Sequence, residues 1–560
     1  MTNSPDKKNL PDTQPYQIYE FKKNNQENIS GYFVVSTAKL NVDTEENNSN
    51  DYLSTVVNQN FFNINNGQAE SSAQKMIEKI AESLESSPEP EIIINIHGYS
   101  STPSDTEVGC KKIYEYVNTH IQQPPNKYIF IGYRWPSENP IKTDQSGSFG
   151  QKLINALYSL PTLLAIDLVV GLTISIGSAI VLLFLNILSN SAVHFFTVLL
   201  ILSGIVSSII FTLIILRIST YFRDTYRAIN YGVIDLVELI RQLDYTVNFP
   251  ANKRIKLSFI SHSMGCFVVT DVIRILSDIF DVNSVNKEPN SDIGNVFRLG
   301  RLVLVAPDVP VETILPGRAN FLRSSLRRCE EAYIFCNEGD LALRITSTAA
   351  NYFSFPARTR ISGYRLGNIT VKHFNDRNDT VGNIPKYGVL NLHEPNYEKD
   401  YPLDKPYNYL EIRSSSSEHR RLDEITKISE NEVPPADLFT YFDCTDYKDD
   451  RSNQIGIVSS ALEKPAINFG DYILLTLAFI RKSIDNKDPQ GVDTHSGYFQ
   501  GAFSQKAIYE LAFLGFQGFL KSLSIEGDKE AQIRAFSQKC QEKQIQVILA
   551  PQIYQQKTQD

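Results

Sequence analysis

The sequence predicts an α/β fold in which a mostly parallel sheet is covered by helices on both faces and is interrupted by an inserted pair of apolar helices. Short apolar runs without polar alternation recur along the chain, and such runs suit strands that are buried on both faces. Helical patterns separate these runs, as in chains that form a doubly wound sheet. Two much longer apolar runs, between residues 162 and 216, do not fit this alternation.

The individual elements follow from the spacing of the apolar residues. An early strand is expected at 31–37, and a helix at 74–84, where apolar side chains recur at helical intervals. A long amphipathic helix is expected at 502–523. Further strands are expected at 92–96, 128–133, 255–260, 302–305, 332–336 and 438–442.

The composition supports a large folded protein and gives no sign of nucleic-acid binding. The 560 residues, 42% of them hydrophobic, are enough for a sizeable core with an insertion. A net charge of −9 without a basic stripe gives nucleic acid little electrostatic attraction. The six cysteines form no CxxC pair and no Cys/His cluster, which predicts buried thiols in a reducing compartment. No metal, nucleotide or flavin motif is visible, so no cofactor is expected.

The two long apolar runs, 162–188 and 193–216, predict a transmembrane helical hairpin. Each holds about 24 to 27 residues, which at a rise of about 1.5 Å per residue cover the hydrocarbon layer of roughly 30 Å. A hairpin returns the chain to its starting side, and Lys and Arg residues flank both ends, which favours the cytoplasmic side for the sheet domain. The N-terminus has no apolar core of a secretory signal, which agrees with that side. The alternative is a helix pair buried inside a large domain.

These features divide the chain into seven segments. The sheet domain is expected in three parts, separated by the two-span hairpin and by a polar stretch that we interpret as a surface excursion. The expected division is a polar N-terminal segment at 1–25, the first part of the sheet domain at 26–152, the hairpin at 153–220, the second part at 221–371, the polar excursion at 372–435, the C-terminal part at 436–524 and a tail at 525–560.

One short segment carries the clearest catalytic signal. An apolar strand runs directly into Ser261-His262-Ser263-Met264-Gly265, and a helical pattern follows. A nucleophile elbow needs this strand–turn–helix context, and its tight turn tolerates only small residues two positions either side of the serine. Gly265 fits this requirement, and Ser261 replaces the usual glycine with another small residue. Ser263 is therefore the candidate nucleophile, the alternative being a Ser/Gly-rich turn that ends a core strand.

A serine hydroxyl needs a histidine to accept its proton and an acid to orient that histidine. In chains with this elbow the order is serine, acid, histidine. His495 follows the last strand candidate and precedes a terminal helix, so it is the candidate base. Asp340, after the second strand beyond the serine, is the favoured acid, and Asp308, after the first, is the alternative.

Backbone N–H groups are expected to stabilise the negative charge that develops during acyl transfer. One should come from Met264, which follows the nucleophile. The other should come from Tyr99, in the loop after the strand at 92–96, because Gly98 lets the backbone approach the reacting carbonyl.

Seven short motifs together resemble a largely uncharacterised branch of the α/β-hydrolase superfamily. The resemblance covers most of 32–524 and implies the α/β-hydrolase fold, with Ser263 as nucleophile, His495 as base and Asp340 or Asp308 as acid. The predicted hairpin lies where lid-type insertions occur in this fold. The motifs are HGYSS at His97, GYRWPS at Gly132, YFRDTYRA at Tyr221, SHSMG at Ser261, LVAPDVP at Leu304, NEGDLAL at Asn337 and THSGYF at Thr494.

The sequence therefore predicts a membrane-anchored serine hydrolase of the esterase, lipase or thioesterase kind. Its substrate would be an acyl ester or thioester, with lipid as one candidate, and it would act through an acyl-enzyme. The alternative is a catalytically inactive, hydrolase-like membrane scaffold or binding protein. Geometry discriminates between the two, because a base must come within hydrogen-bond reach of Ser263.

Overall fold

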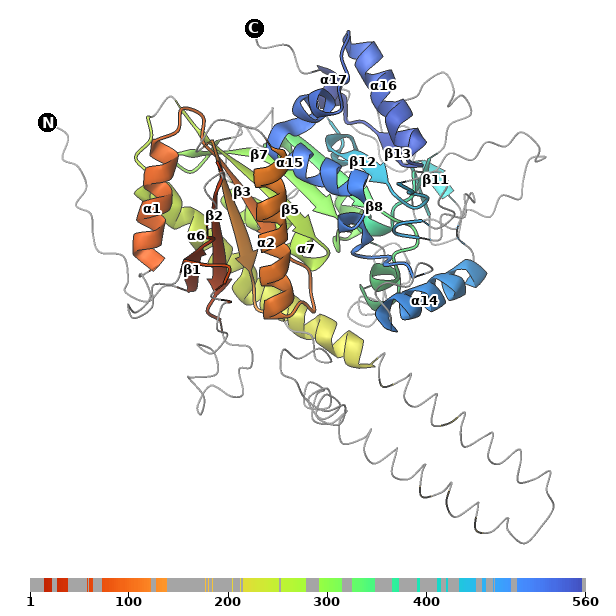
Figure 1. The fold of residues 1–560 in the computed structure, drawn as a ribbon. Helices are drawn as coiled ribbons and strands as arrows, with labels where there is room; N and C mark the ends of the chain where they lie inside the picture. The colour runs from red at the N-terminus through yellow and green to blue at the C-terminus, as the bar shows by residue number, and fades with distance from the viewer. Residues whose placement is uncertain are drawn as a thin grey trace, which may run out of the picture.

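A large mixed sheet with helices on both faces forms the body of the protein (Figure 1). The computed structural model describes residues 15–22, 28–38, 58, 60–63, 73–121, 127–137, 215–250, 253–277, 292–314, 325–347, 365–371, 390–392, 410–413, 419–421, 433–449, 456–459, 467, 469–484 and 491–555, and the single positions 177, 180, 184, 204 and 212. All statements below concern these residues.

Ten of the described strands form the main sheet, in the order β1-β2-β4-β3-β5-β7-β8-β12-β13, with β6 paired to β7. From β2 to β12 every neighbouring pair is parallel, whereas β1, β6 and β13 pair antiparallel. The strands are β1 Tyr16–Glu20, β2 Ser30–Ser36, β3 Glu91–Ile96, β4 Tyr128–Arg134, β5 Ile255–His262, β6 Asp292–Ile293, β7 Phe297–Val305, β8 Glu331–Cys336, β12 Thr440–Asp443 and β13 Gln546–Ile548.

The helices cover the sheet in two layers, each with its own apolar core. One face carries α1 Ala73–Glu85, α6 Val233–Thr246 and α7 Met264–Leu276. The other face carries α2 Pro103–His120, α15 Ala502–Ser522 and α16 Lys529–Glu542. The central strands are buried over almost their whole length, because both of their faces lie under helices. All six cysteines are buried and free of disulfides, which confirms the prediction of buried thiols.

The remaining described elements lie around this body. Residues 215–227 are helical and lead through a π-helical turn, η2 Ala228–Gly232, into α6. The others are η3 Val311–Ile314, η4 Ala342–Ser347, η6 Leu366–Asn368, η7 Pro435–Leu438, α14 Phe469–Ile484, η8 Gly497–Phe499 and α17 Pro551–Gln555, with a small antiparallel sheet of β9 Leu390–Leu392, β10 Leu410–Arg413 and β11 His419–Arg421.

The predicted mostly parallel sheet with helices on both faces is confirmed. Each apolar run predicted as a strand forms one, shifted by a few residues at its ends, and the helices predicted at 74–84 and 502–523 are α1 and α15. Several elements were not foreseen, among them helices α16 and α17. Strand β1 lies in the N-terminal segment, strand β13 in the segment expected to be a tail, and the small sheet in the polar excursion.

The predicted transmembrane hairpin lies almost entirely outside the described residues. Only positions 177, 180, 184, 204 and 212 and the last two residues of the second run, 215 and 216, are described. In the part of the chain that is described, no helix combines the length and the apolar character needed to cross a membrane.

Candidate active site

Ser263 stands at the point where β5 ends and α7 begins. Its backbone has φ 54° and ψ −124°, in a region that residues with a Cβ adopt only under strain. Hydrogen bonds hold both of its peptide groups: its N–H donates to the carbonyl of Val305 at 3.0 Å, and its carbonyl accepts from the N–H of Asp308 at 3.1 Å. The neighbouring strand β7 and the loop after it therefore fix the strained turn predicted from the sequence.

Two glycines allow the start of α7 to pack directly against the end of β3. A Cβ on Gly265 would lie 2.4 Å from the carbonyl oxygen of His97, and a Cβ on Gly98 would lie 2.9 Å from the Cβ of Ser263. Neither contact is sterically possible, so only glycine permits this approach at both positions. The loop after β3 is thereby brought against the nucleophile.

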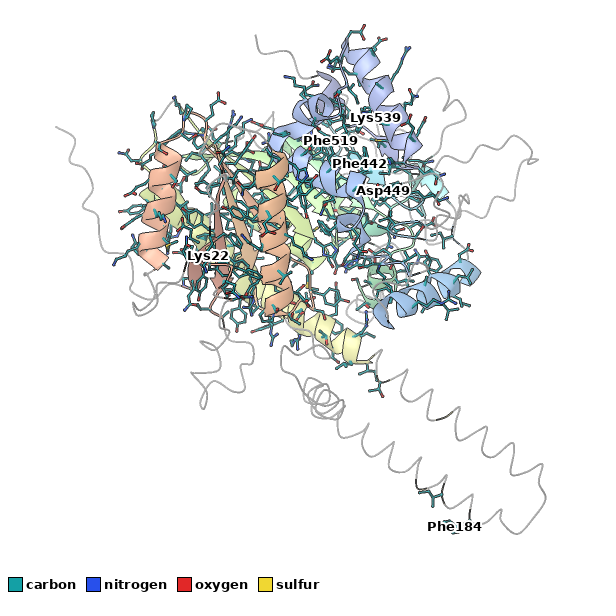
Figure 2. All side chains as sticks on the ribbon, viewed as in Figure 1. Lys22, Phe184, Phe442, Asp449, Phe519 and Lys539 are labelled. Carbon is teal, nitrogen blue, oxygen red and sulfur yellow. The ribbon has the colours of Figure 1, made fainter. Side chains whose placement is uncertain are left out.

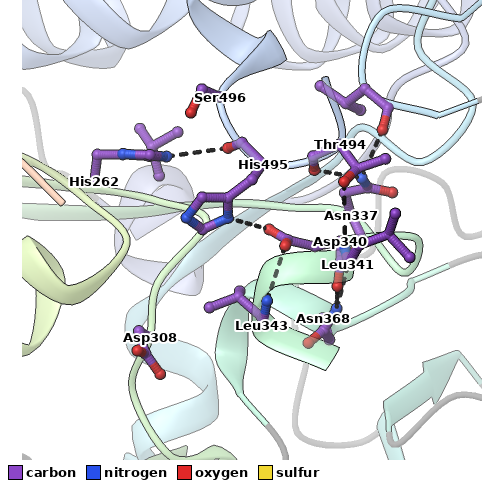
Figure 3. A network of polar contacts seen from close by, with 12 residues as sticks. His262, Asp308, Asn337, Asp340, Leu341, Leu343, Asn368, Thr494, His495 and Ser496 are labelled. Carbon is purple, nitrogen blue, oxygen red and sulfur yellow. Dashed lines mark hydrogen bonds and ion pairs between the residues drawn. The ribbon is translucent and has the colours of Figure 1, made fainter. Parts of the chain in front are cut away.

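His495, the candidate base, and one of the two candidate acids form a hydrogen-bonded pair (Figure 3). The Nδ1 atom of His495 lies 2.7 Å from Oδ2 of Asp340, and Oδ1 of Asp340 accepts the N–H of Leu343 at 3.1 Å. Burial, the largest single influence, works to lower the pKa of His495, but the charge and hydrogen bond of Asp340 together with the charges of Asp493 and Asp308 outweigh it, so the pKa of this imidazole is raised. Burial also raises the pKa of Asp340. The carboxylate therefore orients the imidazole and favours its protonated form.

Asp308 does not contact His495 and instead belongs to a separate buried cluster. Its Oδ1 lies 2.9 Å from Nε of Arg365, and its Oδ2 accepts the hydroxyl of Ser347 at 3.0 Å. The hydroxyl of Tyr221 also faces Oδ1, at 3.4 Å. Of the two acids that the sequence left open, the structure brings Asp340 to the histidine.

Asn337 joins the loop that carries the acid to the loop that carries the base. Its side-chain amide donates to the carbonyl of Thr494 at 3.0 Å and to that of Val458 at 2.9 Å, and its Oδ1 accepts the N–H of Gly339 at 2.9 Å. The sequence offered one signal for this role, since Asn337 opens the NEGDLAL motif. Its long-range partners follow only from the fold.

His262, the residue before Ser263, contacts both the backbone and the ring of His495. Its Nε2 lies 3.0 Å from the carbonyl oxygen of His495, and the two rings are 4.7 Å apart between centroids. Burial lowers the pKa of His262 to about 3, so the ring is neutral and donates one N–H to that carbonyl. Sequence reasoning did not foresee this contact.

The residues expected to form the oxyanion hole lie on either side of Ser263. Met264 is the first residue of α7, so its N–H has no acceptor within the helix and lies at the positive end of the helix dipole. Tyr99 follows Gly98 in the loop against the nucleophile. His97 in this loop stacks on Trp135 with ring centroids 5.1 Å apart, and burial lowers its pKa to about 4.

Ser263 and His495, the two residues expected to exchange a proton, do not hydrogen-bond to each other in the structure. Both Oγ of Ser263 and Nε2 of His495 are buried, and neither has a hydrogen-bond partner among the described residues. Ser263 has no solvent-exposed surface. A buried polar atom without a partner costs about 1–3 kcal/mol, and catalytic hydrogen bonds are often long before substrate binds. Two buried polar atoms without partners among the described residues, on adjoining loops, are typical of a ligand-binding site.

The sheet order, the elbow after β5 and the helices on both faces define the α/β-hydrolase fold. A family model described as "Alpha/beta hydrolase of unknown function (DUF900)" matches residues 217–380, which include Ser263, Asp340 and Asp308. This match confirms the resemblance to a largely uncharacterised branch of α/β hydrolases and supports hydrolase activity. No curated protein and no solved structure matches the chain.

The close approach of α7 to β3 predicts a strong penalty for a side chain at Gly265. Because an added Cβ would meet backbone atoms rather than a flexible side chain, Gly265→Ala should lower the free energy of unfolding by about 1–3 kcal/mol. The matched control is Gly109→Ala in α2, where an added Cβ would meet no atom of the described residues within 4 Å and the change should raise stability by about 0.5–1 kcal/mol. Urea unfolding measures both, and equal effects would contradict the packing described here.

The pair of His495 and Asp340 predicts a specific pH dependence for the reactivity of Ser263. A base must be neutral, so reactivity should rise with pH through the raised pKa of His495. Asp340→Asn removes the charge that raises this pKa, so the rise should move to lower pH, and the plateau rate should fall by on the order of 10⁴-fold. The rate of phosphonylation by a fluorophosphonate, followed against pH, measures both effects. Asp308→Asn should have a far smaller effect, and the reverse order would assign the acid to Asp308.

Proposed function

We propose that the chain is a membrane-anchored serine hydrolase that cleaves carboxylic acyl esters or thioesters through Ser263, His495 and Asp340. One observation carries the proposal. A serine in strained backbone geometry and a histidine hydrogen-bonded to a buried carboxylate occupy adjoining loops at the carboxyl edge of the sheet, and each presents a buried polar atom that lacks a partner among the described residues. Enzyme sites of this fold lie at that edge.

The proposed reaction has two halves. Oγ of Ser263 attacks the acyl carbonyl carbon while Nε2 of His495 takes the hydroxyl proton, and the N–H groups of Met264 and Tyr99 stabilise the resulting oxyanion. The tetrahedral intermediate collapses, the leaving oxygen or sulfur receives the proton from His495, and an acyl-enzyme remains. Water then attacks the acyl-enzyme with His495 again acting as base, which releases the acid and restores Ser263. Asp340 stays ionised and holds the imidazole throughout.

The surroundings of the site favour an apolar acyl group. The ring of Tyr221 packs edge-on against Tyr99 at 6.0 Å between centroids, and Phe499 packs edge-on against His262 at 5.5 Å. The thioether of Met264 lies at the start of α7, 4.0 Å from the hydroxyl of Thr225. Aromatic and thioether surfaces bind acyl chains better than they bind charged groups.

The described positions of the first apolar run support the anchor. Ile180 and Phe184 are helical, and they are 49% and 70% exposed. Figure 2 shows Phe184 far from Phe442 and Phe519, which are fully buried in the sheet domain. A helix pair buried in a large domain, the alternative reading of this segment, would cover such side chains. Their exposure therefore favours a membrane-inserted pair, in which lipid would cover these side chains. The sheet domain would then lie on the cytoplasmic side.

A covalent probe tests the catalytic part of the proposal. A fluorophosphonate should label the wild-type chain at Ser263, and Ser263→Ala should abolish the label, because the probe reacts only with an activated serine. Ser261→Ala is the matched control, since Ser261 is equally buried but its hydroxyl faces Cys266. Mass spectrometry identifies the modified residue. A wild-type chain that stays unlabelled, or a label that survives Ser263→Ala, would favour the inactive scaffold.

Membrane extraction tests the anchor. The full chain should remain in the membrane pellet after alkaline carbonate washing. Ile205→Arg with Val206→Arg should release it, because each central arginine costs roughly 2.5–3.5 kcal/mol of insertion free energy. Ile229→Arg with Ile234→Arg provides the control, since these residues are exposed on the sheet domain at 43% and 55%. Release of the wild-type chain by carbonate would contradict the anchor.

A further inference from the structure

We propose that Asp224 is a positioning residue that holds the loop after β3, residues 97–101, so that the N–H of Tyr99 faces the reacting carbonyl. The inference rests on the proposed function and adds to it a residue from the helix at 215–227. The described part of this helix starts with the last two residues of the second apolar run, and its motif YFRDTYRA has no part in the triad.

The carboxylate of Asp224 is fully buried and binds two other segments at once. Its Oδ2 accepts the backbone N–H of Ser100 at 2.9 Å and the hydroxyl of Ser137 at 2.9 Å. Its Oδ1 faces Nη2 of Arg223 at 2.9 Å and Nη1 of Arg227 at 3.8 Å. A charged acceptor with both oxygens engaged makes strong and geometrically restrictive hydrogen bonds.

Ser100 needs this acceptor because its backbone is strained. Its φ of 55° lies in the left-handed region, which costs about 1–3 kcal/mol for a residue other than glycine and persists only where neighbours impose it. The bond from the N–H of Ser100 to Asp224 fixes the orientation of the peptide between Tyr99 and Ser100. The carboxylate of Asp224, on a different element, therefore stabilises the strained backbone of Ser100.

The next residue transmits this constraint to the oxyanion donor. The N–H of Ser101 donates to the hydroxyl oxygen of Ser137 at 3.2 Å, and the hydroxyl of Ser101 donates to the carbonyl of Gly98 at 3.1 Å. In a planar trans peptide the carbonyl and the N–H point in opposite directions. Fixing the carbonyl of Gly98 therefore fixes the N–H of Tyr99, on the far side of the same peptide.

The helix at 215–227 also contacts this loop through an aromatic pair, because Tyr221 packs against the ring of Tyr99. Three motifs that the triad leaves unexplained thus meet at one carboxylate: HGYSS supplies Ser100, GYRWPS supplies Ser137, and YFRDTYRA supplies Asp224. The helix at 215–227 therefore contacts the loop that carries the proposed oxyanion donor, Tyr99.

Steady-state kinetics with p-nitrophenyl butyrate tests the inference on the full chain. Asp224→Ala should lower kcat by about 100-fold and change KM by no more than about threefold, because a misplaced oxyanion donor affects the transition state and not substrate binding. Asp224→Asn keeps an acceptor oxygen for Ser100 and should recover part of that loss. The control is Asp244→Ala. Asp244 also accepts backbone N–H groups, from Asn295 at 2.8 Å and Val296 at 2.9 Å, but before β7, at the opposite edge of the sheet.

Amide hydrogen exchange separates this inference from the proposed function. The peptide that covers 97–101 should lose at least roughly tenfold in protection in Asp224→Ala and keep it in Asp244→Ala, whether or not any ester is hydrolysed. Unchanged protection in Asp224→Ala would overturn the inference, as would a kcat equal to that of Asp244→Ala. An inactive wild-type chain that still shows the loss of protection would refute the proposed function and leave the role of Asp224 in holding the loop intact.

Discussion

The left-handed backbone at Ser263, packed against the end of β3, is the constraint on which the site depends. The turn has a positive φ at a residue with a Cβ, and hydrogen bonds to Val305 and Asp308 maintain it. Gly265 lets the first turn of α7 approach the carbonyl of His97. If either feature were lost, the serine would leave the strand tip and the loop with Tyr99 would move away. The end of β3, the loop after β7 and the first turn of α7 all contact this turn.

Around that turn, segments far apart in the chain supply single groups. The proposed acid, Asp340, comes from the loop after β8 and the proposed base, His495, from the loop before α15, and Asn337 connects the two loops. The loop after β3 accepts a second support from Asp224, which lies on the helix at 215–227. Asn337 and Asp224 are both buried side chains that hydrogen-bond to backbone atoms of another loop. Such bonds fix a loop more firmly than contacts between exposed side chains would.

The sequence predicted the central strands and the elbow because their physical signals are local. Runs such as Ile92–Ile96 have no polar alternation, and the serine follows its strand directly. Strands β1 and β13 were not predicted, because these edge strands are short and contain polar residues such as Gln17 and Gln546. Asp340 and Asp308 could not be separated because both follow consecutive parallel strands, and only tertiary contacts place Arg365 and Ser347 on Asp308. The role of Asp224 was equally hidden, because its partners lie 124 and 87 residues away in the sequence.

A structure of the covalent phosphonate adduct would show whether Ser263, His495 and the two N–H groups act together, because the adduct resembles the charge distribution of the tetrahedral intermediate. We expect phosphorus bonded to Oγ of Ser263, a phosphonyl oxygen within about 3 Å of the N–H groups of Tyr99 and Met264, and Nε2 of His495 turned toward Oγ. Phosphorus on another residue would contradict the assignment of Ser263 as the nucleophile. A phosphonyl oxygen directed away from both N–H groups would contradict the proposed oxyanion hole.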